Sequence, residues 1–328
     1  MPPKARVRAN VRPEILVWAR ETAGFLIEEA ARKIAVRPER VIAWESGEAQ
    51  PTIPQLRKMS QVYRRPLGVF YLPEVPKGFQ VMRDYRRLPG DGIRRFSADL
   101  TLEMRAAQER RELMLDLLEE IDEAPPVFRF AATMEEPPEA LGLRIREFLG
   151  ITRQLQATWR DPRIAFKAWR NRMENAGVLV LQMARVETEV VSGFAIAHDR
   201  LPVVAVNKRD PWARRGFSLL HEFTHLALRA SGVSDLDVDA QRPPEDQSVE
   251  VFCNAVAAAA LMPRDDFLTE PLVAERPVAS REWDDSTILE LSRTFSVSRE
   301  AVVRRLVTFG RASEAFYRRK RAQYAAEL

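Results

Sequence analysis

Apolar residues recur at helical spacing through residues 13–72, and no part of this stretch alternates as a strand does. The pattern therefore predicts an all-α head. Its short helices are expected at residues 13–22, 28–34, 38–47, 53–63 and 66–72, with Ile42 and Trp44 facing the core. Prolines and glycines then gather between residues 73 and 92, which indicates a domain boundary.

A long amphipathic helix is predicted for residues 97–123. Leu100, Ala107, Met114 and Ile121 recur there every seven residues. We interpret this helix as a packed connector. The alternative is a coiled coil that joins two copies of the chain into a dimer.

The rest of the chain mixes helices with short strands, which predicts an α+β body with a small antiparallel or mixed sheet. The expected organisation is a head at 1–75, a linker and connector helix at 76–124, and a body at 125–328. Helices are predicted at 138–149, 162–176, 211–228, 248–261, 285–295 and 298–308, and strands at 178–181, 190–197 and 201–206.

Composition narrows the class of protein. Hydrophobic residues make up 46% of the chain and charged residues 30%, which is enough apolar surface for a packed core. The sequence has no apolar run long enough to span a membrane. Its first 20 residues carry charges throughout and no apolar core, so we expect no secretory signal and a cytoplasmic protein. The single cysteine, Cys253, excludes a disulfide framework and a cysteine-rich zinc site, and is expected to be a small core residue.

Charge separates the head from the rest of the chain. Residues 1–96 carry 19 basic and 10 acidic side chains, a net charge of +9, whereas the remainder carries −5. A basic head indicates a nucleic acid or an acidic partner, and the alternative is a solvated basic surface.

The chemistry-bearing motif is His221-Glu222-Phe223-Thr224-His225. Positions i and i+4 of a helix share a face, so both imidazoles can bind one metal ion. Glu222 lies next to that face, where it can take a proton from metal-bound water. The motif predicts a Zn²⁺ site, with Mn²⁺ as another possible ion. The alternative is a pair of hydrogen-bonded core histidines.

A third ligand is expected because catalytic zinc usually has three. Glu250 is the preferred candidate, since it is a charged residue at the start of an apolar helix. Asn254 follows one turn later and is expected to orient a ligand histidine, or else to make a helix–loop hydrogen bond. His198 is expected in an exposed turn, with a possible substrate or oxyanion role. Alternative third ligands are the aspartates of a predicted loop that also contains Glu245: Asp235, Asp237, Asp239 and Asp246.

The strand before the motif is predicted to bind substrate. Pro202 suits an edge strand, and an edge beside a metal site can receive an extended peptide. This favours a peptidase among hydrolases. The predicted peptide-binding residues are Val203, Val204, Ala205, Val206 and Asn207.

Within about residues 140–310 the chain resembles the ImmA/IrrE family of metallopeptidases. The resemblance implies a zincin-like body with His221, His225 and Glu250 as metal ligands and Glu222 as general base. It also implies cleavage of helix-turn-helix repressors after DNA damage or in mobile elements. The matching stretches are Val203–Asn207, Arg215–His225, Glu250–Pro263 and Ser298–Leu306.

The head resembles the lambda-repressor-like (XRE) helix-turn-helix domain, through Glu28–Val36 and Pro38–Gly47. Ala35 stands where that family prefers glycine. A protein-docking module is the rival interpretation. Base contacts are expected from exposed residues at the start of the predicted helix at 38–47, which corresponds to the recognition helix of that family. Phosphate contacts are expected from basic residues around this helix. The first group is Arg37, Glu39, Arg40 and Ala43, and the second is Arg32, Lys33, Arg57 and Lys58.

The sequence therefore predicts a zinc-dependent endopeptidase that cleaves a specific protein, a helix-turn-helix transcriptional repressor, in a stress or mobile-element response. The alternative is a DNA-binding regulator or antitoxin-like protein whose peptidase fold serves as a sensor or an interaction module.

Overall fold

The structure is a computed structural model, and it describes residues 7–76, 83–84, 96–188, 190–234, 244–278 and 280–327. The chain divides into two compact units. One consists of Met1–Val81 with Arg95–Glu109, and the other of Met82–Arg94 with Arg110–Leu328.

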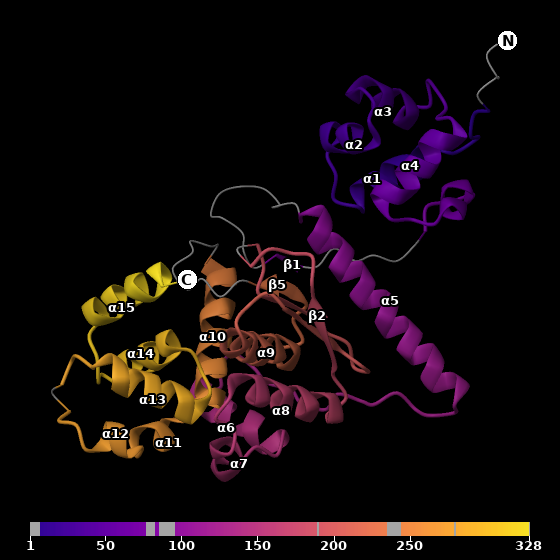
Figure 1. Cartoon of the computed structure of the whole chain (residues 1–328). Helices are drawn as coiled ribbons and strands as arrows, with labels where there is room; N and C mark the ends of the chain where they lie inside the picture. Colours follow the sequence, from indigo (N-terminus) through magenta and orange to yellow (C-terminus); the bar gives the residue numbers. More distant parts are fainter. Residues whose placement is uncertain are drawn as a thin grey trace. The chain divides into compact units, whose positions relative to one another are not determined.

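The first unit is all-α, as predicted (Figure 1). Proline occupies one of the first two positions of α1, α3 and α4, where its missing N–H costs no helical hydrogen bond. Thr52 and Gln55 form a capping box at the start of α4. The elements are α1 (Pro13–Glu21), α2 (Ile27–Ile34), α3 (Pro38–Glu45), α4 (Ile53–Tyr63) and the 3₁₀ helix η1 (Leu67–Tyr71).

The core of this unit contains Val41 and Trp44 of α3 but not Ile42, which is 49% exposed. The prediction that Ile42 faces the core is therefore wrong. Val41 and Trp44 are three apart and share a face, whereas Ile42 is rotated by about 100° from Val41. Beside this core, Arg20 of α1 donates two hydrogen bonds, of 2.8 and 2.9 Å, to the two carboxylate oxygens of Glu45.

The predicted connector is α5 (Ala98–Glu120). Leu100, Met104 and Ala107 in its first half, which belongs to the first unit, are buried. In the second half Met114 is partly exposed, and Ile121 just beyond the helix is 63% exposed. The apolar positions of the first half are thus packed, as expected of a connector, whereas Met114 and Ile121 are exposed. The coiled coil stays a prediction.

The second unit is α+β, in agreement with the predicted fold class (Figure 1). The sequence pattern did not indicate β1, β5, α7, α11, α12 or α15, most of which are short. The helices are α6 (Pro138–Phe148), α7 (Arg153–Ala157), α8 (Pro162–Asn175), α9 (Trp212–Ala227), α10 (Pro244–Leu261), α11 (Arg264–Leu268), α12 (Pro271–Ala274), α13 (Asp285–Phe295), α14 (Arg299–Thr308) and α15 (Glu314–Ala326).

The strands of the described residues form one mixed five-stranded sheet in the order β1-β5-β3-β4-β2. β3 runs antiparallel to both β4 and β5, whereas β2 is parallel to β4 and β1 is parallel to β5. The strands are β1 (Arg83–Asp84), β2 (Leu179–Met183), β3 (Gly193–Ile196), β4 (Val203–Asn207) and β5 (Gly232–Ser234).

β4 is an interior strand of the sheet. Pro202 directly precedes β4 and does not interrupt its ladder, so the strand pairs with β2 on one side and with β3 on the other. A strand that is paired on both sides has no free N–H and C=O row for another peptide. The prediction of an edge strand at 201–207 is therefore wrong.

α9 packs against β3 and β4, and its other neighbours include α8 and α10. Buried side chains hold the carboxyl end of α10, where backbone carbonyls lack helical partners. Arg146 donates to the carbonyl of Ala260, Gln156 to that of Leu261, and Arg305 to that of Met262. These bonds anchor α10, one of the two helices that carry the candidate chemistry. None of the described helices is both long and apolar enough to span a lipid bilayer.

Candidate metal centre

The motif histidines lie on the buried face of α9. Leu219, Leu220 and Phe223 are fully buried around them, because this helix is apolar on the sides that meet the sheet and α10. His221, Glu222 and His225 are themselves 0% exposed. Polar groups buried this deeply need partners, since an unsatisfied buried imidazole or carboxylate costs free energy.

Glu250 reaches the same place from α10. This helix begins at Pro244, so Glu250 lies in its second turn and not at its start. Asp246, predicted in a loop, is a buried residue of α10 and is not part of the cluster. Glu245 also belongs to α10, but its side chain lies outside the described residues. Asp235, Asp237 and Asp239 lie outside them altogether.

His221, His225 and Glu250 converge, with one ligand atom of each within 4.8 Å of the others. The two Nε2 atoms are 3.2 Å apart. Nε2 of His225 lies 3.2 Å from one carboxylate oxygen of Glu250, and Nε2 of His221 lies 3.5 Å from the other. Three donor atoms therefore face one point.

Asn254 determines which nitrogen of His221 faces that point. Its Oδ1 lies 3.0 Å from Nδ1 of His221. A carboxamide oxygen only accepts, so Nδ1 donates, and in the neutral imidazole Nε2 carries the lone pair. This is the tautomer that a metal ligand needs, and the partner on the far nitrogen is the kind that orients ligand histidines.

The donor set fits a zinc-class ion. Two ligands at about 2.0–2.1 Å from a tetrahedral ion lie about 3.3 Å apart, which matches the separation of the two Nε2 atoms. Two imidazoles with one carboxylate also leave the fourth position open, as catalytic sites do. His221, His225 and Glu250 are the residues that would hold the ion.

Charges within the cluster favour a cation. Burial acts to raise the pKa of Glu250, but the charges and hydrogen bonds of His221 and His225 lower it to about 2. Burial also lowers the pKa of His225. For His221 burial again acts to lower the pKa, but the charges of Glu250 and Glu222 and the hydrogen bonds of Glu250 and Asn254 together raise it. A positive charge beside the ionised Glu250 carboxylate is therefore favourable in this apolar interior. Either a proton on an imidazole or a bound metal ion can provide that charge.

Comparison with known proteins agrees with this geometry. Residues 173–307 match the IrrE N-terminal-like domain, a peptidase family, and residues 16–70 match a helix-turn-helix family. The two matches, in this order along the chain, correspond to the ImmA/IrrE architecture. It is a metallopeptidase-like protein with an N-terminal helix-turn-helix domain. A comparison with curated proteins returns no match.

In this ImmA/IrrE-like chain, the predicted substrate strand is a buried structural strand. Val203, Val204, Ala205 and Val206 are buried, and the amide of Asn207 donates to the carbonyls of Val186 and Val191. These residues cannot receive a peptide by strand addition, because both sides of β4 are already paired.

The predicted DNA-contacting residues lie at the surface of the helix-turn-helix unit. Ala43, also predicted to contact bases, is half-buried. α2 and α3 carry most of these side chains, with Arg37 preceding the first turn of α3. The exposed ones are Arg32, Lys33, Arg37, Glu39, Arg40, Arg57 and Lys58.

Two other predicted residues lie outside the centre. His198 is half-buried in a loop, and burial, together with the charge of Arg111, lowers its pKa. Cys253 is fully buried, as expected of a core residue, and burial raises the pKa of its thiol well above the ordinary value.

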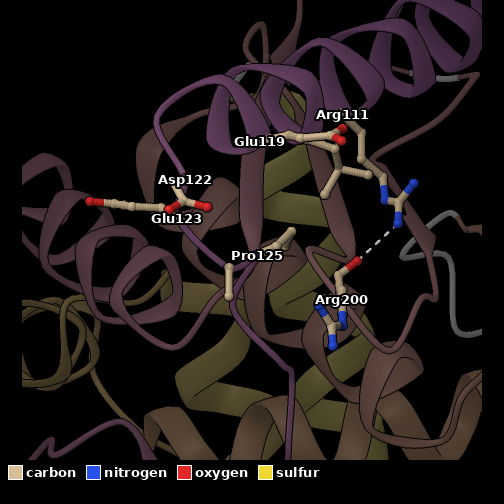
Figure 2. A pocket seen from close by; sticks show the side chains of 8 residues that line it. Arg111, Glu119, Asp122, Glu123, Pro125 and Arg200 are labelled. Atoms are coloured by element: carbon tan, nitrogen blue, oxygen red, sulfur yellow. Dashed lines mark hydrogen bonds between the residues drawn. The ribbon is translucent and has the colours of Figure 1, made fainter.

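A cavity of about 510 Å³ lies elsewhere, between the carboxyl end of α5 and the turn at Arg200 (Figure 2). Arg111 lines this cavity and donates hydrogen bonds to the backbone carbonyls of Arg200 and Leu201. Its lining includes no member of the histidine–glutamate cluster. Arg111 therefore anchors a turn there, and the cavity is not part of the candidate centre.

Proposed function

We propose that this protein is a zinc-dependent endopeptidase that cleaves a specific protein partner. The observation that carries the proposal is the buried convergence of His221, His225 and Glu250, with Glu222 adjacent on the same helix. The match to a peptidase family over the same residues supports it.

In this proposal each side chain has one task. His221, His225 and Glu250 would hold a zinc ion, which when bound would supply a Lewis acid and a water of lowered pKa. Glu222 accepts a proton from the water at a carboxylate oxygen and passes it to the nitrogen of the leaving amine. Asn254 keeps His221 in the ligand tautomer through the bond to Nδ1.

The proposed substrate is a helix-turn-helix transcriptional repressor, and the setting is a stress or mobile-element response. The ImmA/IrrE architecture supports this choice. The head is proposed to bind DNA, because its basic side chains are exposed on and around α3. A head that holds DNA near one repressor raises the local concentration of that substrate and restricts cleavage to it.

A second candidate is a DNA-binding regulator that uses the peptidase fold as a sensor. One observation favours it: the three ligand candidates and Glu222 are all 0% exposed. A peptidase must admit a peptide to these groups, whereas a sensor need only admit an ion.

The test incubates the full chain, with Zn²⁺ added, with the repressor encoded nearest to its gene, and identifies fragments by mass spectrometry. Glu222→Gln is the matched control because it keeps the shape of the side chain and removes the base. We expect wild type to cut at one site and Glu222→Gln to lose turnover by about 10²–10⁴-fold. Equal cleavage by both proteins would overturn the mechanism. Binding without cleavage, with and without DNA, would favour the sensor.

A further inference from the structure

Gly193 begins β3 directly beside the side chain of Glu222. A Cβ atom at position 193 would lie 2.6 Å from Oε1 and 2.8 Å from Cγ of Glu222, and 3.0 Å from the carbonyl oxygen of Ala205. Non-bonded carbon atoms prefer separations of about 3.5–4.0 Å. Position 193 therefore has no room for a side chain while Glu222 keeps its place.

Glycine is not needed at position 193 for its backbone angles. The described glycines with positive φ are Gly24, Gly47, Gly150, Gly177 and Gly310, and Gly193 is not among them. It pairs within the sheet with Val206 and Ser234 in ordinary strand register. What glycine provides at this position is space.

Glu222 cannot turn away from this contact into solvent. Its side chain is 0% exposed, and the helix that carries it packs directly on β3 and β4. The flexible carboxylate end would have to move within a packed interior. A displacement of about 1 Å from the productive geometry can cost about 100-fold in rate.

We propose that Gly193 is a positioning residue for Glu222: the bare backbone of β3 leaves the slot that the Glu222 carboxylate occupies. This inference rests on the proposed role of Glu222 as general base. Proton transfer needs the carboxylate within hydrogen-bond reach of the water, so filling the slot impairs turnover without touching a metal ligand.

The kinetic test compares Gly193→Ala with Gly216→Ala in the full chain. Gly216 lies on α9, the helix of Glu222, and a Cβ there has no neighbour within 4 Å. With Zn²⁺ content equal in both variants, we expect Gly193→Ala to lower kcat by about 100-fold with KM little changed. We expect Gly216→Ala to retain wild-type values. Full activity of Gly193→Ala, beside an inactive Glu222→Gln, would overturn this inference and leave the proposed function standing.

A second readout does not depend on activity. The thermal midpoint of the metal-free protein is measured for Gly193→Ala, Glu222→Ala and the double variant. Removing the Glu222 side chain empties the slot, so the added methyl group should lower the midpoint much less in the Glu222→Ala background than in wild type. Equal losses in both backgrounds would show that Gly193 does not accommodate Glu222. This result holds whether or not any repressor is cleaved, so it separates failure of this inference from failure of the proposed function.

Discussion

Nδ1 of His221 donates to Oδ1 of Asn254 at 3.0 Å, and this bond links the helix of the histidine motif to the helix that carries Glu250. Asn254 lies one helical turn after Glu250, so the carboxylate and the amide reach the same imidazole from one face of α10. The contact points Nε2 of His221 at His225 and Glu250.

Asn254→Ala is expected to weaken Zn²⁺ binding by about 10–100-fold, because His221 loses the partner that sets its tautomer and ring orientation. Competition with a chromophoric chelator measures the affinity. Asn254→Asp is the control, since it keeps an acceptor at the same place and should retain most of the affinity. Unchanged affinity in Asn254→Ala with a lower thermal midpoint would assign Asn254 a purely structural role.

Glu250→Gln is expected to lose the metal, because the cluster keeps its two imidazole ligands but loses its one charged ligand. Elemental analysis of protein purified without chelator should give about one zinc-class ion per wild-type chain and almost none for the variant. Chelation of the wild-type protein should lower its thermal midpoint, since an ion that binds the folded state alone stabilises it. Full metal content in Glu250→Gln would mean that another residue is the third ligand.

Metal affinity is expected to fall as the pH falls. Glu250 raises the pKa of His221 in the metal-free cluster, so a proton occupies the imidazole up to a higher pH than in a free histidine. The ion must displace that proton, and acid therefore favours the metal-free form. Titrations of the apo-protein with Zn²⁺ at several pH values measure the effect, together with proton release in weakly buffered solution. Zn²⁺ binding that releases no proton above pH 6 would contradict this expectation.

The full chain is expected to bind duplex DNA with an affinity that falls steeply as salt concentration rises, because the head makes phosphate contacts. Reversing the charges of Arg37 and Arg40 should abolish any preference for sequence. Reversing Arg32 and Lys33 should instead weaken binding to all sequences equally and reduce the salt slope. Fluorescence anisotropy with specific and scrambled duplexes distinguishes the two pairs. No binding at low salt would favour a protein-docking head.

Ala35→Gly is expected to stabilise the head by about 0.5–1 kcal/mol. Ala35 ends α2 in the left-handed conformation, with φ 65°, which glycine adopts without steric cost. Ala43→Gly within α3 is the control of opposite sign, because glycine inside a helix destabilises by about 1 kcal/mol. Chemical denaturation of both variants measures the difference. A loss of stability in Ala35→Gly would show that the left-handed residue carries no strain.

Local spacing in the sequence was enough to predict most helices and the pairing of His221 with His225, since residues four apart on a helix share a face wherever that helix lies. The apolar run after Glu250 predicted a buried helix for the same reason. Proline at a helix start was equally reliable, because its effect on the backbone is confined to its own neighbours.

Only the tertiary structure decided which surfaces those elements bury. Pro202 suggested an edge, yet β4 is an interior strand, because strand order depends on partners distant in the chain. Ile42 is as apolar as Val41, but the packing of α3 turns it outward. The meeting of Glu250 with the histidines and the slot at Gly193 likewise arise between elements that are distant in sequence. Spacing along one helix or strand predicts its own periodicity, whereas contacts between elements depend on how their side chains fill common space.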